Sequence, residues 1–285
     1  MNTKTKLAKM FLLIGLLLLT PKTFSRNPNF HIYICFGQSN MEGQGAIEVQ
    51  DKTVNSRFKV LQSLDCPSTG RNKGTWYPAV PPLCQCGTGL SPADYFGRTL
   101  VENLPDSITV GVINVAVGGC DIRLFDKDLY QDYDSTFNEE WYLSKVRMYD
   151  WNPRKHLMDL AKQAQNDGVI KGILLHQGEA NTGNTQWPLY VKKVYNDMLS
   201  ELSLSADTVP LLSGEVLYTG VYKDMNPIIR QLPNTVPTAH IISAEGLGGD
   251  WAHFTSEGYR TLGIRYAATM LPLLGVGTKI IEPEK

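Results

Sequence analysis

Short apolar, β-branched segments alternate with helical segments along most of the chain, and this alternation restricts the possible folds most. The apolar segments show little polar alternation, as is typical of strands buried on both faces of a parallel sheet. They lie at residues 31–36, 108–117, 169–176, 210–217 and 238–244. Helices are expected at residues 92–103, 153–166, 188–203, 224–231 and 256–274. This order predicts an α/β fold: a three-layer α/β/α sandwich with a mainly parallel five-stranded sheet.

Two long segments, residues 45–91 and 121–152, interrupt this alternation. The first is rich in Gly, Pro, Ser and Cys, and the second in Asp, Tyr and Trp. Each follows the C-terminal end of a predicted strand, which is the edge where open α/β sheets bind ligands. Long loops at that edge are typical of the walls or lids of a functional site. We therefore expect one domain over residues 26–285, and a second small domain is the alternative.

The N-terminal residues have the pattern of a secretory signal peptide. Three lysines, Lys4, Lys6 and Lys9, precede an apolar run of about ten residues, and small residues follow near position 25. The apolar run is shorter than the roughly twenty residues that a membrane-spanning helix needs. We expect residues 1–25 to be removed and the protein to be secreted or periplasmic. An uncleaved membrane anchor is the alternative.

The formal net charge is −1, from 27 Lys and Arg against 28 Asp and Glu, and the chain has no basic tail. Nucleic acids and anionic membranes are bound through positive charge, so the sequence supports neither partner. A neutral ligand is expected. The sequence does not indicate an oligomeric state.

The five cysteines, Cys35, Cys66, Cys84, Cys86 and Cys120, leave at least one without an intrachain partner. Cys35 lies in a predicted strand and is expected to be a small buried side chain. In an oxidising compartment Cys66 could pair with Cys84 or with Cys86, closing a loop of about twenty residues. A zinc site is the alternative, although no fourth ligand is evident in the neighbouring sequence.

The sequence Gly37-Gln38-Ser39-Asn40-Met41 directly follows the first predicted strand. A serine at a strand-to-helix turn presents its Oγ at the edge of the sheet, and its N–H can stabilise an oxyanion there. Met41 replaces the last glycine of the G-x-S-x-G pattern, and a serine at this position could also be only a helix cap. The assignment of Ser39 as a nucleophile therefore depends on its partners.

Asp250 and His253 are three residues apart, in a loop just before the last predicted helix. This spacing lets the carboxylate reach His253 Nδ1, which would fix the tautomer and leave Nε2 to face the nucleophile. The alternative is that both residues only cap the helix.

Two further motifs end predicted strands. Gly118 and Gly119 can turn a main-chain N–H into the crevice and leave space for an acyl group, or they form a simple turn. In the polar motif at residues 176–179, the Gln177 amide could donate to an oxyanion and Glu179 could orient a histidine, or both only end the strand. Because the C-terminal ends of parallel strands share one edge of a sheet, the motifs can converge on a single site.

The order of these motifs resembles that of the SGNH hydrolases, specifically their acetylxylan esterase and sialate O-acetylesterase branch. The resemblance covers nearly all of the chain after residue 25 and is carried by the motifs at residues 37–41, 118–119, 176–179 and 250–254. It implies a flavodoxin-like fold and removal of acetyl groups from sugars without a metal or other cofactor. The chain departs from the wider family at Gln38, where an Asp usually precedes the nucleophile, and in the usual oxyanion Asn, whose place we assign to Gln177.

We therefore expect a serine esterase in which Ser39 attacks an acetyl carbonyl while His253 accepts the serine proton. Asp250 is the expected acid of the triad, and Glu179 is the alternative. The expected oxyanion donors are the N–H groups of Ser39 and of Gly118 or Gly119, and the amide of Gln177. The residues assigned to substrate contacts are Gln38, Asn40 and Trp251.

Aromatic residues in the two long segments suggest a carbohydrate partner, because aromatic faces suit the C–H surfaces of sugars; the alternative is that they pack the loops onto the core. They are Trp76, Tyr77, Trp141, Tyr142 and Trp151. Trp187 and Trp251 lie beside the catalytic motifs and are expected to line the pocket. Two other functions stay open: a lipid or thioester hydrolase on the same fold, which would need a long apolar channel, and a non-catalytic glycan-binding protein.

Overall fold

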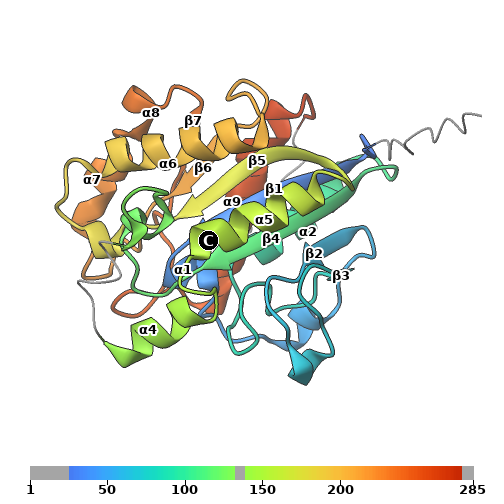
Figure 1. Ribbon diagram of the computed structural model, residues 1–285, viewed down its shortest axis with the longest axis horizontal. Helices are drawn as coiled ribbons and strands as arrows, with labels where there is room; N and C mark the ends of the chain where they lie inside the picture. The colour runs from blue at the N-terminus through green and yellow to red at the C-terminus, as the bar shows by residue number, and fades with distance from the viewer. Residues whose placement is uncertain (1–25, 132–138, 278–285) are drawn as a thin grey trace, which may run out of the picture.

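A central sheet with helices on both faces forms the body of the molecule (Figure 1), so the predicted α/β/α sandwich is confirmed. The computed structural model describes residues 26–131 and 139–277. The seven strands have the order β3-β2-β4-β1-β5-β6-β7. Their bounds are β1 Phe30–Gly37, β2 Phe58–Leu61, β3 Trp76–Pro78, β4 Thr109–Ala116, β5 Val169–His176, β6 Leu211–Gly214 and β7 Ala239–Ile242.

Neighbouring strands pair in parallel throughout the sheet, except that β3 is antiparallel to β2. The predicted five strands are the consecutive series β4-β1-β5-β6-β7. The count of five was wrong because β2 and β3 come from the segment at residues 45–91, where each is too short to give a recognisable apolar run. That segment is therefore partly built into the sheet.

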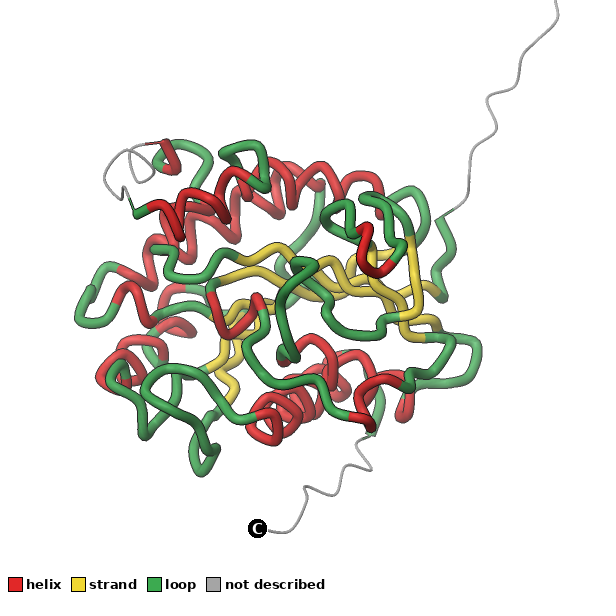
Figure 2. Tube along the Cα trace, turned by 90° about the horizontal axis from the view of Figure 1, so that it is seen from below, coloured by secondary structure: helices red, strands yellow, loops and turns green. Residues whose placement is uncertain are grey.

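The helices pack as two layers, one on each side of the sheet, as Figure 2 shows in a view turned from that of Figure 1. In β1, Ile32, Ile34 and Phe36 contribute to one buried cluster and Tyr33 and Cys35 to the other. This is the two-residue alternation of a strand that is covered on both faces. The cluster on the first face also includes side chains of α5 and α6, and the cluster on the second face those of α2 and α9.

Three of the five predicted helices match closely: α2 (Pro92–Asn103), α5 (Pro153–Ala164) and α6 (Trp187–Leu202). The last, α9 (Ser256–Leu273), is capped by Thr255, whose side chain accepts a hydrogen bond from Gly258 N–H at 3.0 Å. Residues 224–231 are less regular and contain the short α7 (Asn226–Ile229). Within the described ranges, helical elements that were not predicted include α1 (Ser39–Glu42), α4 (Glu140–Arg147), α8 (Leu232–Thr235) and the short 3-10 turns at Val49–Lys52, Pro67–Thr69, Ile122–Phe125, Glu179–Asn181 and Lys223–Met225.

A disulfide joins Cys66 to Cys86, with a Cα–Cα distance of 5.4 Å. Cys84, the other candidate partner, is a free and buried thiol, like Cys35 and Cys120. Burial raises the pKa of the Cys84 thiol to about 12, so this side chain behaves as a small hydrophobic group.

The predicted signal peptide lies outside the described residues. Among the helices of the described ranges, none is long and apolar enough to cross a membrane.

Candidate active site

Ser39 and His253 lie side by side, with 3.1 Å between Ser39 Oγ and His253 Nε2. Ser39 is the first residue of α1, two positions after the C-terminal end of β1, and His253 is in the loop between β7 and α9. Gly37 makes the turn possible: its φ is +147°, and a Cβ there would lie 2.1 Å from the carbonyl oxygen of His176. The two ends of neighbouring strands can pass this closely only at a glycine.

The Asp250 carboxylate binds the main chain of its own loop. Its Oδ1 accepts hydrogen bonds from the N–H groups of Ala252 at 2.9 Å and His253 at 2.7 Å, and these bonds lower the pKa of Asp250. Both residues are described, and neither a hydrogen bond nor an ion pair joins this carboxylate to the imidazole ring. The expected contact with His253 Nδ1 is therefore not formed, because an aspartate in a tight loop is well placed to accept from the N–H groups that follow it.

Glu179 is buried and faces Asn40 and His176. Its Oε1 accepts a hydrogen bond from Asn40 Nδ2 at 2.5 Å and lies 3.7 Å from His176 Nε2. Burial opposes ionisation of Glu179, but the neighbouring His176 and the bond from Asn40 outweigh it and lower its pKa. Asn40 Nδ2 also donates to the carbonyl oxygen of Ala252 at 3.1 Å. Glu179 is thus linked through Asn40 to the loop that carries His253.

Asn40 does not have the position that a substrate contact would require. Its side chain is fully buried, and its Oδ1 accepts a hydrogen bond from Tyr259 Oη at 2.5 Å. Its amide nitrogen donates to Glu179 and to Ala252, so Asn40 holds the loop of His253 from the protein interior.

Of the two glycines expected to provide oxyanion donors, Gly118 has its N–H occupied. It donates to Glu42 Oε1 at 3.1 Å. Gly119 N–H makes no hydrogen bond within the described residues, and both glycines line the cavity at Ser39. As the first residue of α1, Ser39 has a main-chain N–H with no acceptor inside its own helix. Among the expected donors, the N–H groups of Ser39 and Gly119 are therefore the ones left without an acceptor in the described residues.

Gln177 lies beneath the site and does not line the cavity, contrary to its expected role as an oxyanion donor. Its Nε2 donates to Asn181 Oδ1 at 2.6 Å, to the Cys120 carbonyl oxygen at 3.1 Å and to Gln38 Oε1 at 3.2 Å. Its Oε1 accepts from Trp187 Nε1 at 2.5 Å. The amide is committed to this buried network, and Trp187, expected in the pocket, is fully buried as part of it.

A cavity of about 730 Å³ opens above Ser39 and His253. Trp251, as expected, lines it and is 57% exposed, and its ring lies 5.9 Å from that of Tyr222 and 5.8 Å from that of His253, centroid to centroid. Gln38 also lines the cavity, as does Trp141, which is exposed. Trp76, in contrast, belongs to the edge strand β3 and packs against Phe30.

Charged side chains that the motifs did not reveal complete the wall. Lys145 of α4 and Arg123 both line the cavity. Lys145 Nζ pairs with the buried Glu42 at 2.6 Å, and Arg123 pairs with Asp121 at 2.7 Å. Glu42 directly follows the serine motif. Its acidic side chain was the sequence feature that could have indicated a cation such as Lys145 in the cavity wall.

Three aspartates, Asp126, Asp128 and Asp197, lie close enough together to hold a metal ion. The Lys193 ammonium donates to all three, at 2.7 to 2.9 Å, and supplies a counter-charge there. None of these residues lines the cavity at Ser39.

Residues 29–272 match the family model described as "Carbohydrate esterase, sialic acid-specific acetylesterase". Among solved structures, a protein from Arabidopsis thaliana is similar with a TM-score of 0.64 and 20% identity, covering 86% of this chain and 99% of that one. A carbohydrate acetylesterase from Xanthomonas citri gives a TM-score of 0.57 and 17% identity over 83% of this chain and 55% of that one. The structure of NanS is similar with a TM-score of 0.56 and 14% identity, and the match covers 87% of this chain and 98% of that one.

At such identities the similar structures show a shared fold, and the family model extends over nearly the whole described chain. The expected membership of an SGNH-type carbohydrate esterase family is confirmed. The chain belongs to the carbohydrate esterases of the sialic acid-specific acetylesterase family.

Proposed function

We propose that the protein is a serine esterase that removes O-acetyl groups from a carbohydrate, with Ser39 as the nucleophile and His253 as the general base. The distance of 3.1 Å between Ser39 Oγ and His253 Nε2, at the base of an open cavity, is the observation that carries this proposal. The family of carbohydrate esterases to which the chain belongs supports an ester of a sugar as the substrate.

In the first step His253 Nε2 accepts the Ser39 hydroxyl proton as Oγ attacks the acetyl carbonyl carbon. The carbonyl π pair moves to the oxygen, and the N–H groups of Ser39 and Gly119 are placed to stabilise it. When the tetrahedral intermediate collapses, His253 returns the proton to the departing sugar hydroxyl. Water then attacks the acetyl-enzyme with His253 again as base, releasing acetate and restoring Ser39.

Asp250 and Glu179 support His253 in different ways. Asp250 fixes the loop by accepting the N–H groups of Ala252 and His253, and its negative charge lies near enough to interact favourably with the His253 imidazolium. Glu179 acts on the same loop through Asn40. Both are positioning residues in this proposal.

The cavity walls support a glycan as the alcohol part of the ester. Trp251, Tyr222 and Trp141 offer aromatic faces to sugar C–H surfaces. A lipid hydrolase would need a long apolar channel, whereas this cavity is lined in part by Lys145 and Arg123. O-acetylated xylan and O-acetylated sialoglycans are the two substrates to compare.

Acetate release from both glycans and from 4-nitrophenyl acetate tests the proposal. We expect Ser39→Ala to lower kcat by on the order of a thousandfold or more on each active substrate. Ser107→Ala, in an exposed turn at the opposite edge of the sheet, is the matched control and should retain full activity. Activity of Ser39→Ala within about tenfold of the parent would show that Ser39 is not the nucleophile.

A further inference from the structure

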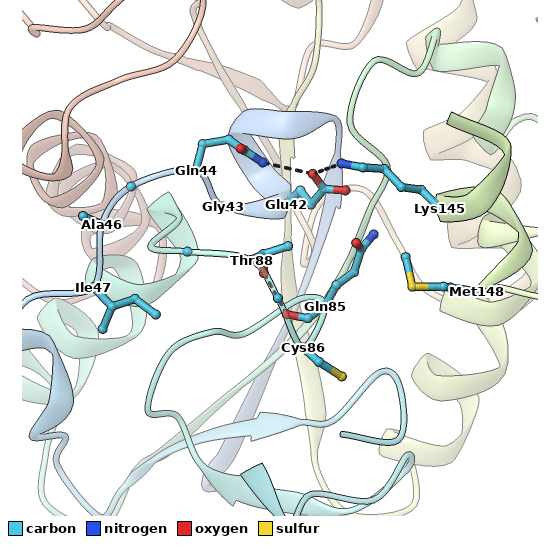
Figure 3. A pocket seen from close by; sticks show the side chains of 13 residues that line it. Glu42, Gly43, Gln44, Ala46, Ile47, Gln85, Cys86, Thr88, Lys145 and Met148 are labelled. Carbon is cyan, nitrogen blue, oxygen red and sulfur yellow. Dashed lines mark hydrogen bonds and ion pairs between the residues drawn. The ribbon is translucent and has the colours of Figure 1, made fainter. Parts of the chain in front are cut away.

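A second cavity, of about 660 Å³, adjoins the one above Ser39, and Gln44 and Lys145 line both. Figure 3 shows its walls: residues 42–47 after β1 on one side, residues 85–89 on the other, and Lys145 and Met148 at the end formed by α4. Neither Ser39 nor His253 lines it. The second cavity therefore continues the first, away from the reacting atoms.

Main-chain hydrogen bonds fix the shape of the second cavity. Gly89 N–H donates to the Gly43 carbonyl oxygen at 2.8 Å, and Gly45 and Leu90 exchange two bonds at 3.1 and 2.7 Å, so the two walls are tied together at their base. The wall at residues 85–89 is anchored further by the Cys66–Cys86 disulfide. A cavity that is already formed before a ligand arrives loses little conformational entropy on binding.

The boundary between the two cavities is held by the buried Glu42. Its Oε2 accepts hydrogen bonds from Lys145 Nζ at 2.6 Å and Gln44 Nε2 at 3.0 Å, the two dashed lines at Glu42 in Figure 3. The carboxylate has no exposed surface, and it balances the one cation of this wall. The second cavity thus presents a surface without net charge.

The remaining lining is suited to hydroxyl groups. The side chains of Gln44 and Thr88 and the main chain of Gly87 supply uncharged polar atoms, and Met148, which is 44% exposed, supplies an apolar surface. Uncharged polar groups around a small apolar area match a pyranose ring, which carries hydroxyls at its edge and C–H groups on its faces.

We propose that the second cavity is a binding subsite for an uncharged sugar residue linked to the acetylated one. The inference rests on the proposed function, since it takes the acetylated residue to occupy the cavity above Ser39. The enzyme would then bind two linked sugar residues of its substrate. Part of its specificity would come from the sugar residue that does not carry the acetyl ester.

The test compares each acetylated monosaccharide with the matching oligosaccharide: acetylated xylose with acetylated xylotetraose, and O-acetylated sialic acid with O-acetylated sialyllactose. Ala46→Trp and Thr88→Trp fill the cavity from opposite walls, and Ser107→Trp, in the exposed turn on the far edge of the sheet, is the matched control. We expect both cavity variants to lower kcat/KM for the oligosaccharide of the active pair at least about tenfold more than for its monosaccharide.

An unchanged ratio of oligosaccharide to monosaccharide kcat/KM in both folded cavity variants would overturn the subsite, even if the enzyme is an active esterase. If the parent releases no acetate from any of these sugars, the proposed function fails instead, and calorimetry with unacetylated xylotetraose and sialyllactose then decides the subsite. Binding that Ala46→Trp weakens supports it; no binding to the parent overturns it.

Discussion

Asn40 Nδ2 donates a hydrogen bond to the Ala252 carbonyl oxygen at 3.1 Å, and this bond ties α1 to the loop that carries His253. The same nitrogen is 2.5 Å from Glu179 Oε1. A buried amide next to Ser39 therefore helps to hold the loop that carries His253 at its distance from Ser39.

Asn40→Ala should lower both stability and kcat. It removes the bond to Ala252 and leaves the buried Glu179 carboxylate with one donor fewer, which costs about 1–3 kcal/mol of unfolding free energy. Tyr259→Phe removes the bond to Asn40 Oδ1 but leaves the bonds from Asn40 Nδ2 to Ala252 and Glu179 in place, so it is the matched control, with the smaller loss of kcat expected. Urea unfolding and 4-nitrophenyl acetate hydrolysis measure the two effects. If Tyr259→Phe lost more activity than Asn40→Ala, the tie to Ala252 would not be the important contact.

Asp250→Ala should lose more activity than Asp250→Asn. The amide oxygen of asparagine can still accept the N–H groups of Ala252 and His253, whereas alanine cannot hold the turn. The comparison is made on kcat with each variant confirmed as folded. Equal losses in the two variants would instead assign the effect to the carboxylate charge. Glu179→Gln, measured beside them, shows which carboxylate supports His253 more strongly.

Glu179 should make stability depend on acid pH. Its pKa in the folded protein is below the ordinary value of 4.5, so its ionised form contributes stability above that value, and the contribution is lost as the pH falls through the lowered pKa. The difference in unfolding free energy between the parent and Glu179→Gln should therefore shrink between neutral pH and about pH 3. Glu102→Gln, an exposed change on α2, controls for global acid effects. A difference that stays constant with pH would contradict this linkage.

Loss of the Cys66–Cys86 disulfide should destabilise the protein by about 3 kcal/mol, the chain-entropy expectation for a closed loop of roughly 20 residues. Cys66→Ser with Cys86→Ser should lower Tm in thermal unfolding. The parent in a reducing buffer is the comparison, and it should approach the double variant. Hydrolysis of 4-nitrophenyl acetate should be largely retained, because Ser39 and His253 lie outside this loop. An unchanged Tm would mean that the loop is held by its other contacts.

Much of the fold follows from local patterns in the sequence. The long strands β1, β4 and β5 each have eight residues and are almost wholly buried, so their apolar runs are unmistakable. In contrast, β2 and β3 have four and three residues. Strands that short are specified by pairing with a neighbour, which no local pattern records.

The contact between Ser39 and His253 was predictable from the sheet topology, since motifs at the C-terminal ends of parallel strands meet at one edge. The hydrogen-bond partners of the expected oxyanion donors could not be predicted from the sequence. Gly118 N–H is taken by Glu42, and the Gln177 amide by Asn181 and Cys120. Which buried donor meets which acceptor is decided by packing among residues far apart in the chain, and here it moved two expected oxyanion donors out of that role.

Ser39 and His253 are separated by 214 positions in the chain. β1 lies in the middle of the sheet, whereas the loop with His253 follows β7 at its edge. The pair is therefore incomplete until the chain extends to the loop that follows β7. A chain that ends before residue 253 contains Ser39 without His253. Under the proposed function, hydrolysis of a small ester would therefore report a chain completed through the loop after β7, and a shorter chain would not deacetylate its surroundings.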